Sequence, residues 1–313
     1  MTLQYGQMTE PTEPPREASP RTPRSPEISR ILGKVRGVFG SLDTYSCLDQ
    51  RDRREFSYYQ NLYEDALLAI DDKILARTLE PVDLQGYTQA LAFPQPDIRT
   101  ALFIGTFDPF QMTHLAAALR YLASPEASAP LVFIIPEGHD NPDKPRRSEY
   151  AYRYQMIRWQ IEGIFQPLIY PLDIGRNADT IEIVRRFIAR FPGARIHITH
   201  LVGSDVLPLA LKWLPKDLEV WAAEAKRKGV TFQYDIFSIQ RGEDEAWKMA
   251  ARDAGVKGVQ IHCDERSLDT PSSTDFRSNQ AFSIVFPTKA VMRHVEVLFR
   301  YDLNKPWDPP TAP

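Results

Sequence analysis

From Thr100 onward, short β-rich runs alternate with segments whose apolar residues recur at helical spacing. This alternation predicts an α/β domain with a Rossmann-like, doubly wound parallel sheet. In such a sheet, ligands bind beyond the carboxyl ends of the strands, where the strand order reverses. The expected strands are 101–105, 131–135, 168–172, 196–202, 233–239 and 259–263, and the expected helices include 112–122, 150–164 and 181–189.

The residues before this α/β region fall into two parts. Residues 1–26 are rich in Pro, Ser, Thr and Arg, which predicts a disordered Pro-rich tail. Residues 27–95 carry two apolar stripes at helical spacing, around Ile31 and around Tyr63, which predict a helical extension packed on the main domain. We place the α/β domain at 96–303 and a C-terminal tail at 304–313.

Composition narrows the classes of protein that fit. The net charge is −3, too balanced to indicate a nucleic-acid partner, and no apolar run approaches the ~20 residues of a membrane helix. The polar N-terminus lacks the apolar core of a signal peptide. With only two cysteines, Cys47 and Cys263, in unrelated contexts, we expect a cytoplasmic protein without structural disulfides.

The most informative motif, GTFDPFQMTH, follows the first expected strand of the sheet. Gly105 ends that strand, an Asp108-Pro turn follows, and a helix is expected from Met112. Backbone N–H groups at such a turn and helix start face an anion, and His114 lies on the first helical turn. The pattern suits a nucleotide phosphate, although it is neither a Walker loop nor the dinucleotide fingerprint GxGxxG.

This decamer is similar to the GxFxPxHxGH signature of the nucleotidyltransferase α/β phosphodiesterase superfamily. Its GTFDP start resembles most the nicotinate/nicotinamide mononucleotide adenylyltransferases. Further segments follow in the order that this family shows. They are 133–144 with its Pro-Asp-Lys, the helix residue Arg153, Gly-Ser-Asp at 203–205 with Trp213 after it, Arg241-Gly, and SSTDFR at 272–277. The resemblance covers roughly residues 100–303 and implies a nucleotidyltransferase domain over 96–303.

The resemblance implies an enzyme of NAD biosynthesis that transfers AMP from ATP to nicotinate or nicotinamide mononucleotide and releases pyrophosphate. The acceptor phosphate arrives already ionised, so catalysis is mostly alignment and neutralisation of charge at phosphorus. The implied partners are ATP and a pyridine mononucleotide. Mg²⁺ is expected to accompany the triphosphate, held by its own oxygens and water, and we assign no protein ligand to it.

Site residues are carried over from the family motifs position by position. The resemblance assigns catalytic roles to His114, Lys144 and Arg277. It assigns contacts with ATP or phosphate to Gly105, Thr106, Phe107, Asp108, Gln111, Gly203, Asp205, Arg241, Ser272, Ser273 and Thr274. It assigns the pyridine nucleotide to Trp213, by stacking, and to Arg153.

The sequence departs from the family pattern in four places. Gln111 replaces the first motif His, Thr113 replaces the Gly before the second, the stretch from 277 to 287 is shorter, and 27–95 is foreign to the minimal form. Two alternatives to the leading function therefore stay open. One is a nucleotidyltransferase fold acting on a different phosphate acceptor. The other is a nucleotide-binding module of low turnover.

Several assigned residues also have a purely structural alternative. Asp108 can be only a turn former, the hydroxyls of 272–274 only a helix cap, and Trp213 only core. Lys144 can belong to a solvated basic loop, and Arg241 can form a surface ion pair. The sequence leaves open the choice between nicotinate and nicotinamide mononucleotide, the role of 1–95 and the oligomeric state, a homo-oligomer included.

Overall fold

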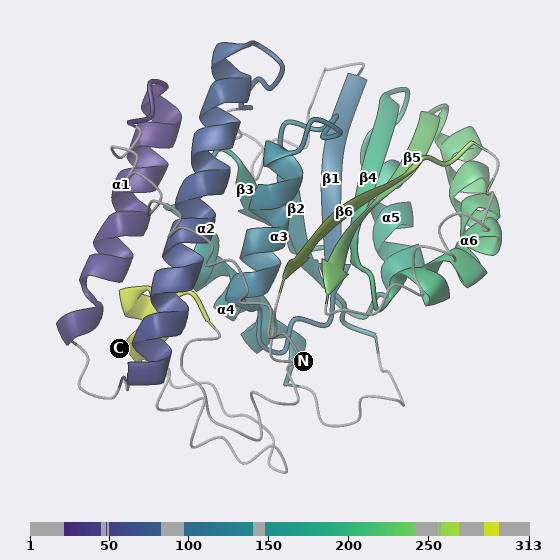
Figure 1. The fold of residues 1–313 in the computed structure, drawn as a ribbon. Helices are drawn as coiled ribbons and strands as arrows, with labels where there is room; N and C mark the ends of the chain where they lie inside the picture. Colours follow the sequence, from purple (N-terminus) through teal and green to yellow (C-terminus); the bar gives the residue numbers. More distant parts are fainter. Residues whose placement is uncertain are drawn as a thin grey trace, which may run out of the picture.

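The computed structural model describes residues 22–44, 48, 50–82, 97–139, 148–241, 256, 258–268 and 285–293. Their centre is a six-stranded parallel sheet with strand order β3-β2-β1-β4-β5-β6 (Figure 1). The strands are β1 Asp97–Gly105, β2 Val132–Pro136, β3 Ile169–Pro171, β4 Arg195–Gly203, β5 Thr231–Arg241 and β6 Ile261–Leu268. The predicted Rossmann-like sheet is confirmed.

Helices cover both faces of the sheet. They are α1 Pro26–Gly40, α2 Gln50–Leu75, α3 Met112–Ala123, α4 Tyr150–Ile161, α5 Thr180–Ala189 and α6 Leu207–Lys228, with a short 3₁₀ turn η1 at Leu42–Thr44. Helices α1 to α4 pack on one face, and α5 and α6 pack on the other. None of the helices described is long and apolar enough to cross a membrane.

The two cores follow from alternation along the strands. On β1, Ala101 and Phe103 face α1 to α4, whereas Leu102 and Ile104 face α5 and α6. Because both faces are covered, residues 101–104 of β1 and 132–135 of β2 form continuous apolar runs, whereas β4 and β5 have polar residues between the apolar ones. Successive side chains of a strand point to opposite faces, so a single apolar run supplies both cores.

The helical extension forms a hairpin that packs outside α3, where α1 and α2 lie side by side (Figure 1). The stripe predicted for the first helix is fully buried, from Ile28 to Phe39. Asp71 on α2 fixes the start of α1, because its carboxylate accepts hydrogen bonds from the backbone N–H groups of Arg24 and Ser25 at 2.9 and 2.8 Å. Helix α1 begins at Pro26, one residue before the predicted start of the helical extension.

Most element boundaries differ from the sequence prediction by one or two residues, and those of β1, β6 and α4 differ by three or more. Strand β1 begins at Asp97 and not at 101, because its first four residues alternate exposed and buried instead of forming an apolar run. Strand β6 is shifted from 259–263 to Ile261–Leu268; it is an edge strand and tolerates charged side chains such as Asp264 and Arg266. Helix α4 ends at Ile161 and not at 164, because Glu162 is extended and Gly163 has φ 73°.

Candidate active site

The motif turn, residues 105–111, lies at the carboxyl end of β1, next to the point where the strand order reverses. From β1 the chain crosses through α3 to β2, on one side of β1, and later returns to β4 on the other side. Phe103 pairs with Leu201, so Gly105 and Gly203 leave the sheet at the same level. The fold therefore brings the motif turn and the predicted 203–205 element together at the switch point.

His114 is fixed on the first turn of α3 by the backbone of the motif itself. The N–H of Gln111 donates a hydrogen bond to His114 Nδ1 at 2.9 Å. Because Nδ1 is an acceptor, the neutral ring carries its proton on Nε2, which is then a hydrogen-bond donor. The ring stacks on Phe110 at 5.6 Å and meets the edges or faces of Phe103 and Phe107 at 5.7 and 5.0 Å. The imidazole is thus held in one orientation and one tautomer.

Gln111 is the residue that precedes α3, and its side chain is buried. The side chain takes part in a capping box with His114, and its Oε1 accepts a hydrogen bond from Thr113 Oγ1 at 3.3 Å. Gln111 and Thr113 are the two positions of the motif that depart from the family signature. The structure places their side chains against each other; phosphate binding by Gln111 stays a prediction.

Asp108 and Arg153 tie the motif turn to the start of α4. The carboxylate of Asp108 accepts a hydrogen bond from the backbone N–H of Ser148 at 2.7 Å. Arg153 is almost fully buried; its Nε donates to Ser148 O at 2.9 Å, and its Nη1 donates to Thr106 O. Both side chains therefore have a structural task. Their contacts with nucleotide stay predictions.

At the end of β4, Gly203 is half-buried and Asp205 is exposed, while the N–H of Ser204 donates to Ile239 O at 2.9 Å. Trp213 lies on the second turn of α6 and is 51% exposed, with Lys212 Nζ 5.3 Å from the ring centre. Its core alternative is wrong, since the indole lies at the surface. Stacking on a pyridine ring stays a prediction.

The remaining predicted site residues cannot be placed. Lys144, Ser272, Ser273, Thr274 and Arg277 lie outside the described residues. Arg241 ends β5, and only its backbone is described. Their roles stay predictions that rest on the family resemblance.

Two residues that no motif indicated also hold the motif turn. Gln160 on α4 is fully buried; its Nε2 donates to Phe110 O at 3.0 Å, and its Oε1 accepts from the N–H of Phe286 at 2.8 Å. Tyr63 on α2 donates its hydroxyl hydrogen to Met112 O at 2.8 Å. In the sequence, Tyr63 is one member of an ordinary helical stripe and Gln160 one polar residue in a helix.

The loops that follow β2 and β3 pack against each other at the same edge of the sheet. The N–H groups of Gly138 and His139 both donate to Ala178 O, at 3.0 and 3.2 Å. The backbones approach so closely that a Cβ on Gly175 would lie 1.9 Å from Pro136 O. Only glycine fits there.

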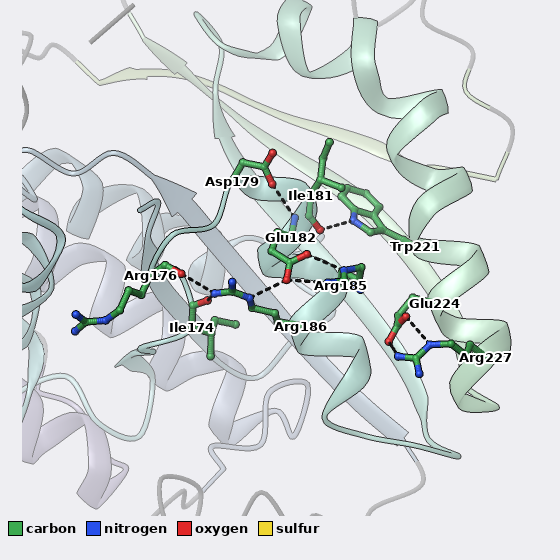
Figure 2. A network of polar contacts seen from close by, with 10 residues as sticks. All are labelled: Ile174, Arg176, Asp179, Ile181, Glu182, Arg185, Arg186, Trp221, Glu224 and Arg227. Atoms are coloured by element: carbon green, nitrogen blue, oxygen red, sulfur yellow. Dashed lines mark hydrogen bonds and ion pairs between the residues drawn. The ribbon is translucent and has the colours of Figure 1, made fainter. Parts of the chain in front are cut away.

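A polar network on α5 holds the loop that follows β3 (Figure 2). Arg186 donates to the carbonyls of Ile174 and Arg176 at 2.9 and 2.7 Å. Glu182 accepts from both Arg185 and Arg186, and the hydrogen bond from Arg185 is the largest of the effects that lower its pKa. Asp179 caps α5 by accepting from the Glu182 N–H at 2.8 Å. The charges of Glu182, Arg185 and Arg186 are paired with one another, and the backbone of the loop after β3 is held in place by Arg186.

Within the described part of the chain, no group of three His, Cys, Asp or Glu side chains is arranged to hold a metal ion. What the described site offers an anion is the N-terminus of α3, the donor on His114 and the backbone of the motif turn.

Comparison with known proteins gives relatives of one kind. The chain is 33% identical over 121 residues to a "Probable nicotinate-nucleotide adenylyltransferase" of Gemmatimonas aurantiaca, covering 37% of this chain and 54% of that protein. It is 31% identical over 117 residues to the protein of the same name from Bordetella petrii, covering 37% and 56%. The chain thus spans about half the length of the curated relatives it matches. No family model matches it.

Among solved structures, two of Plasmodium falciparum nicotinic acid mononucleotide adenylyltransferase are similar to this chain. The one complexed with NaAD is 16% identical, with a TM-score of 0.44, and the one complexed with APC is 15% identical, with a TM-score of 0.41. Each likeness covers 66% of this chain and 100% of the other. The sequence comparisons confirm that the chain resembles the nicotinate-nucleotide adenylyltransferases, over about half the length of those relatives.

Proposed function

We propose that this chain is an adenylyltransferase that joins AMP from ATP to a pyridine mononucleotide and releases pyrophosphate. An oxygen of the acceptor phosphate attacks the α-phosphorus of ATP, and the bond between that phosphorus and the bridging oxygen to the β-phosphorus breaks. Mg²⁺ enters with ATP as part of the substrate. Both curated relatives are named for nicotinate nucleotide, which favours nicotinate mononucleotide as the first acceptor to test.

The observation that carries the proposal is the fixed tautomer of His114. Its Nδ1 accepts from the Gln111 N–H, so the ring proton lies on Nε2, and we assign this N–H to the non-bridging oxygens that gain charge in the transition state. The N-terminus of α3 adds positive potential at the same place. No general base is needed, because the acceptor phosphate is ionised at neutral pH. The arrangement fits a reaction that requires alignment and charge neutralisation.

The residues outside the described ranges complete the proposal through the resemblance. Lys144 and Arg277 would neutralise the triphosphate, and the hydroxyls of Ser272, Ser273 and Thr274 would bind its terminal phosphates. Gly203 and Asp205 would border the adenosine, and Trp213 would stack on the pyridine ring. Trp213 is half exposed, so its indole ring is accessible to a ligand that stacks on it.

The test is dinucleotide formation and pyrophosphate release by the full chain with ATP, Mg²⁺ and either mononucleotide. We expect His114→Ala to lower kcat by about 10²- to 10⁴-fold, as for loss of one charge-stabilising donor. His114→Asn keeps an acceptor near the Nδ1 position and should lose as much turnover, which separates the Nε2 donor from the cap. His262→Ala on β6 is the control and should keep its turnover. Near-normal turnover of the His114 variants would contradict the assigned role.

A different phosphate acceptor is the alternative that the Gln111 and Thr113 pair favours, since both depart from the signature. A screen of nucleotide and sugar phosphates that follows pyrophosphate release distinguishes it. Release with another acceptor, and with neither pyridine mononucleotide, would replace the proposed substrate and keep the reaction type.

A further inference from the structure

Three carbonyl oxygens of the motif turn and the start of α3 are held by buried side chains from other elements. Arg153 on α4 binds the oxygen of Thr106, and Gln160 on α4 binds that of Phe110. Tyr63 on α2 binds the oxygen of Met112 at 2.8 Å. The last of these contacts comes from the N-terminal hairpin, which lies outside the segment that resembles the adenylyltransferases.

The hydroxyl of Tyr63 is directed by a rigid surrounding. The side chain is fully buried, and its ring lies 6.1 Å from that of Phe39, 6.3 Å from Phe165 and 5.9 Å from Phe286. Burial raises the pKa of Tyr63 well above 10, so the phenol stays protonated and donates. Core packing leaves the ring little freedom, and the position of the hydroxyl is therefore set by the hairpin.

The direction of the Met112 carbonyl determines the direction of the N–H of the next residue, Thr113. In a trans peptide, the N–H points opposite to the C=O, so the bond from Tyr63 to the Met112 oxygen also sets the direction of the Thr113 N–H. That N–H is in the first turn of α3, where backbone donors have no partner within the helix and face an anion. His114 follows directly and shares this turn.

We propose that Tyr63 is a positioning residue for the anion-binding first turn of α3, and that the α1–α2 hairpin is thereby a working part of the active site. The inference rests on the proposed adenylyl transfer and adds to it a residue that never touches the substrate. The hairpin acts through one hydrogen bond, which orients the donors that meet the phosphates.

The experiment compares Tyr63→Phe with Ile70→Val in the full chain. Tyr63→Phe removes only the hydroxyl, whereas Ile70→Val trims a fully buried side chain two turns further along the same helix and removes no hydrogen bond. Both should lower the melting temperature modestly. We expect Tyr63→Phe to lower kcat about 3- to 10-fold, as for loss of one oriented neutral hydrogen bond. Ile70→Val should keep kcat and the KM for the mononucleotide.

The affinity for ATP with Mg²⁺, measured by calorimetry, separates this inference from the proposed function. If the wild-type chain binds ATP and forms no dinucleotide, the proposed function fails. Positioning by Tyr63 is then supported by a 3- to 10-fold weaker Kd in Tyr63→Phe than in Ile70→Val. Equal kcat in an active enzyme, or equal Kd in an inactive one, overturns the inference. A wild-type chain that neither reacts nor binds ATP overturns both.

Discussion

Acid should destabilise this protein through His200, a histidine that is buried on β4 and unconnected with the proposed site. Its Nδ1 lies 2.6 Å from the hydroxyl of Tyr234, whose ring packs on Trp221 at 4.7 Å. Burial lowers the pKa of His200 to about 4, from an ordinary value of 6.5. Between these two values the unfolded chain binds the proton and the folded chain does not, so stability is lost as the pH falls.

The size of this effect follows from the two pKa values. A shift of one unit corresponds to about 1.4 kcal/mol, so most of about 3 kcal/mol should be lost between pH 7.5 and pH 4.5. That is a large share of the stability of a typical domain. The loss is assigned to one residue, and it can therefore be removed by substitution.

Urea unfolding at pH 7.5 and 4.5, followed by circular dichroism, measures the loss. The matched variant is His200→Leu with Tyr234→Phe, which replaces both hydrogen-bond partners by apolar groups and leaves no buried polar atom of the pair unsatisfied. Other carboxylates and histidines titrate alike in the two chains, so their contribution cancels. We expect the variant to lose about 2–3 kcal/mol less than the wild type over this pH range. Equal losses in the two chains would refute the assignment to His200.

Two further predictions concern packing and charge. Arg120→Met should lower the free energy of unfolding by about 3 kcal/mol at pH 7 in urea, because its 2.9 Å ion pair with Asp264 is buried and its loss leaves that carboxylate with the largely exposed Arg266 as its charged partner; a loss below about 1 kcal/mol would show that the existing pair with Arg266 is enough to stabilise the carboxylate. Gly175→Ala should cost at least about 1–3 kcal/mol, since its Cβ meets the Pro136 carbonyl, whereas Gly37→Ala in α1, with nothing within 4 Å, should gain about 0.5–1 kcal/mol in the same assay.

The sheet was predictable because short β-rich runs alternate along the chain with segments whose apolar residues recur at helical spacing. What escaped prediction follows from weaker signals. Helix α6 was not among the segments predicted, because Pro215 lies inside it and it exposes the apolar side chains of Leu209, Trp213 and Val220. Its fold is decided by packing on α5 and β5, which a local pattern does not contain.

The residues of the candidate site likewise fall into those that the sequence indicated and those that it did not. His114 and the motif turn were found because their chemistry requires particular residues at fixed spacing. Tyr63 and Gln160 were not, because a tyrosine in an apolar stripe and a glutamine in a helix are ordinary residues until the fold shows which carbonyl each one meets. Residues that position a site act at long sequence separation, 49 residues in the case of Tyr63 and Met112. Periodicity and motifs contain information only about residues that are close together in the sequence.

The exchange of the first motif His for Gln111 bears on whether the chain turns over or only binds. Thr113 adds a hydroxyl in the buried first turn of α3, and a buried hydroxyl without a partner is costly. Gln111 Oε1 accepts from that hydroxyl, so the two departures from the signature form one structural exchange. The exchange leaves intact the backbone bond from the Gln111 N–H to His114 Nδ1, which sets the tautomer needed for charge stabilisation. That tautomer puts the ring proton on Nε2, so the exchange at Gln111 and Thr113 is compatible with the charge stabilisation that adenylyl transfer requires.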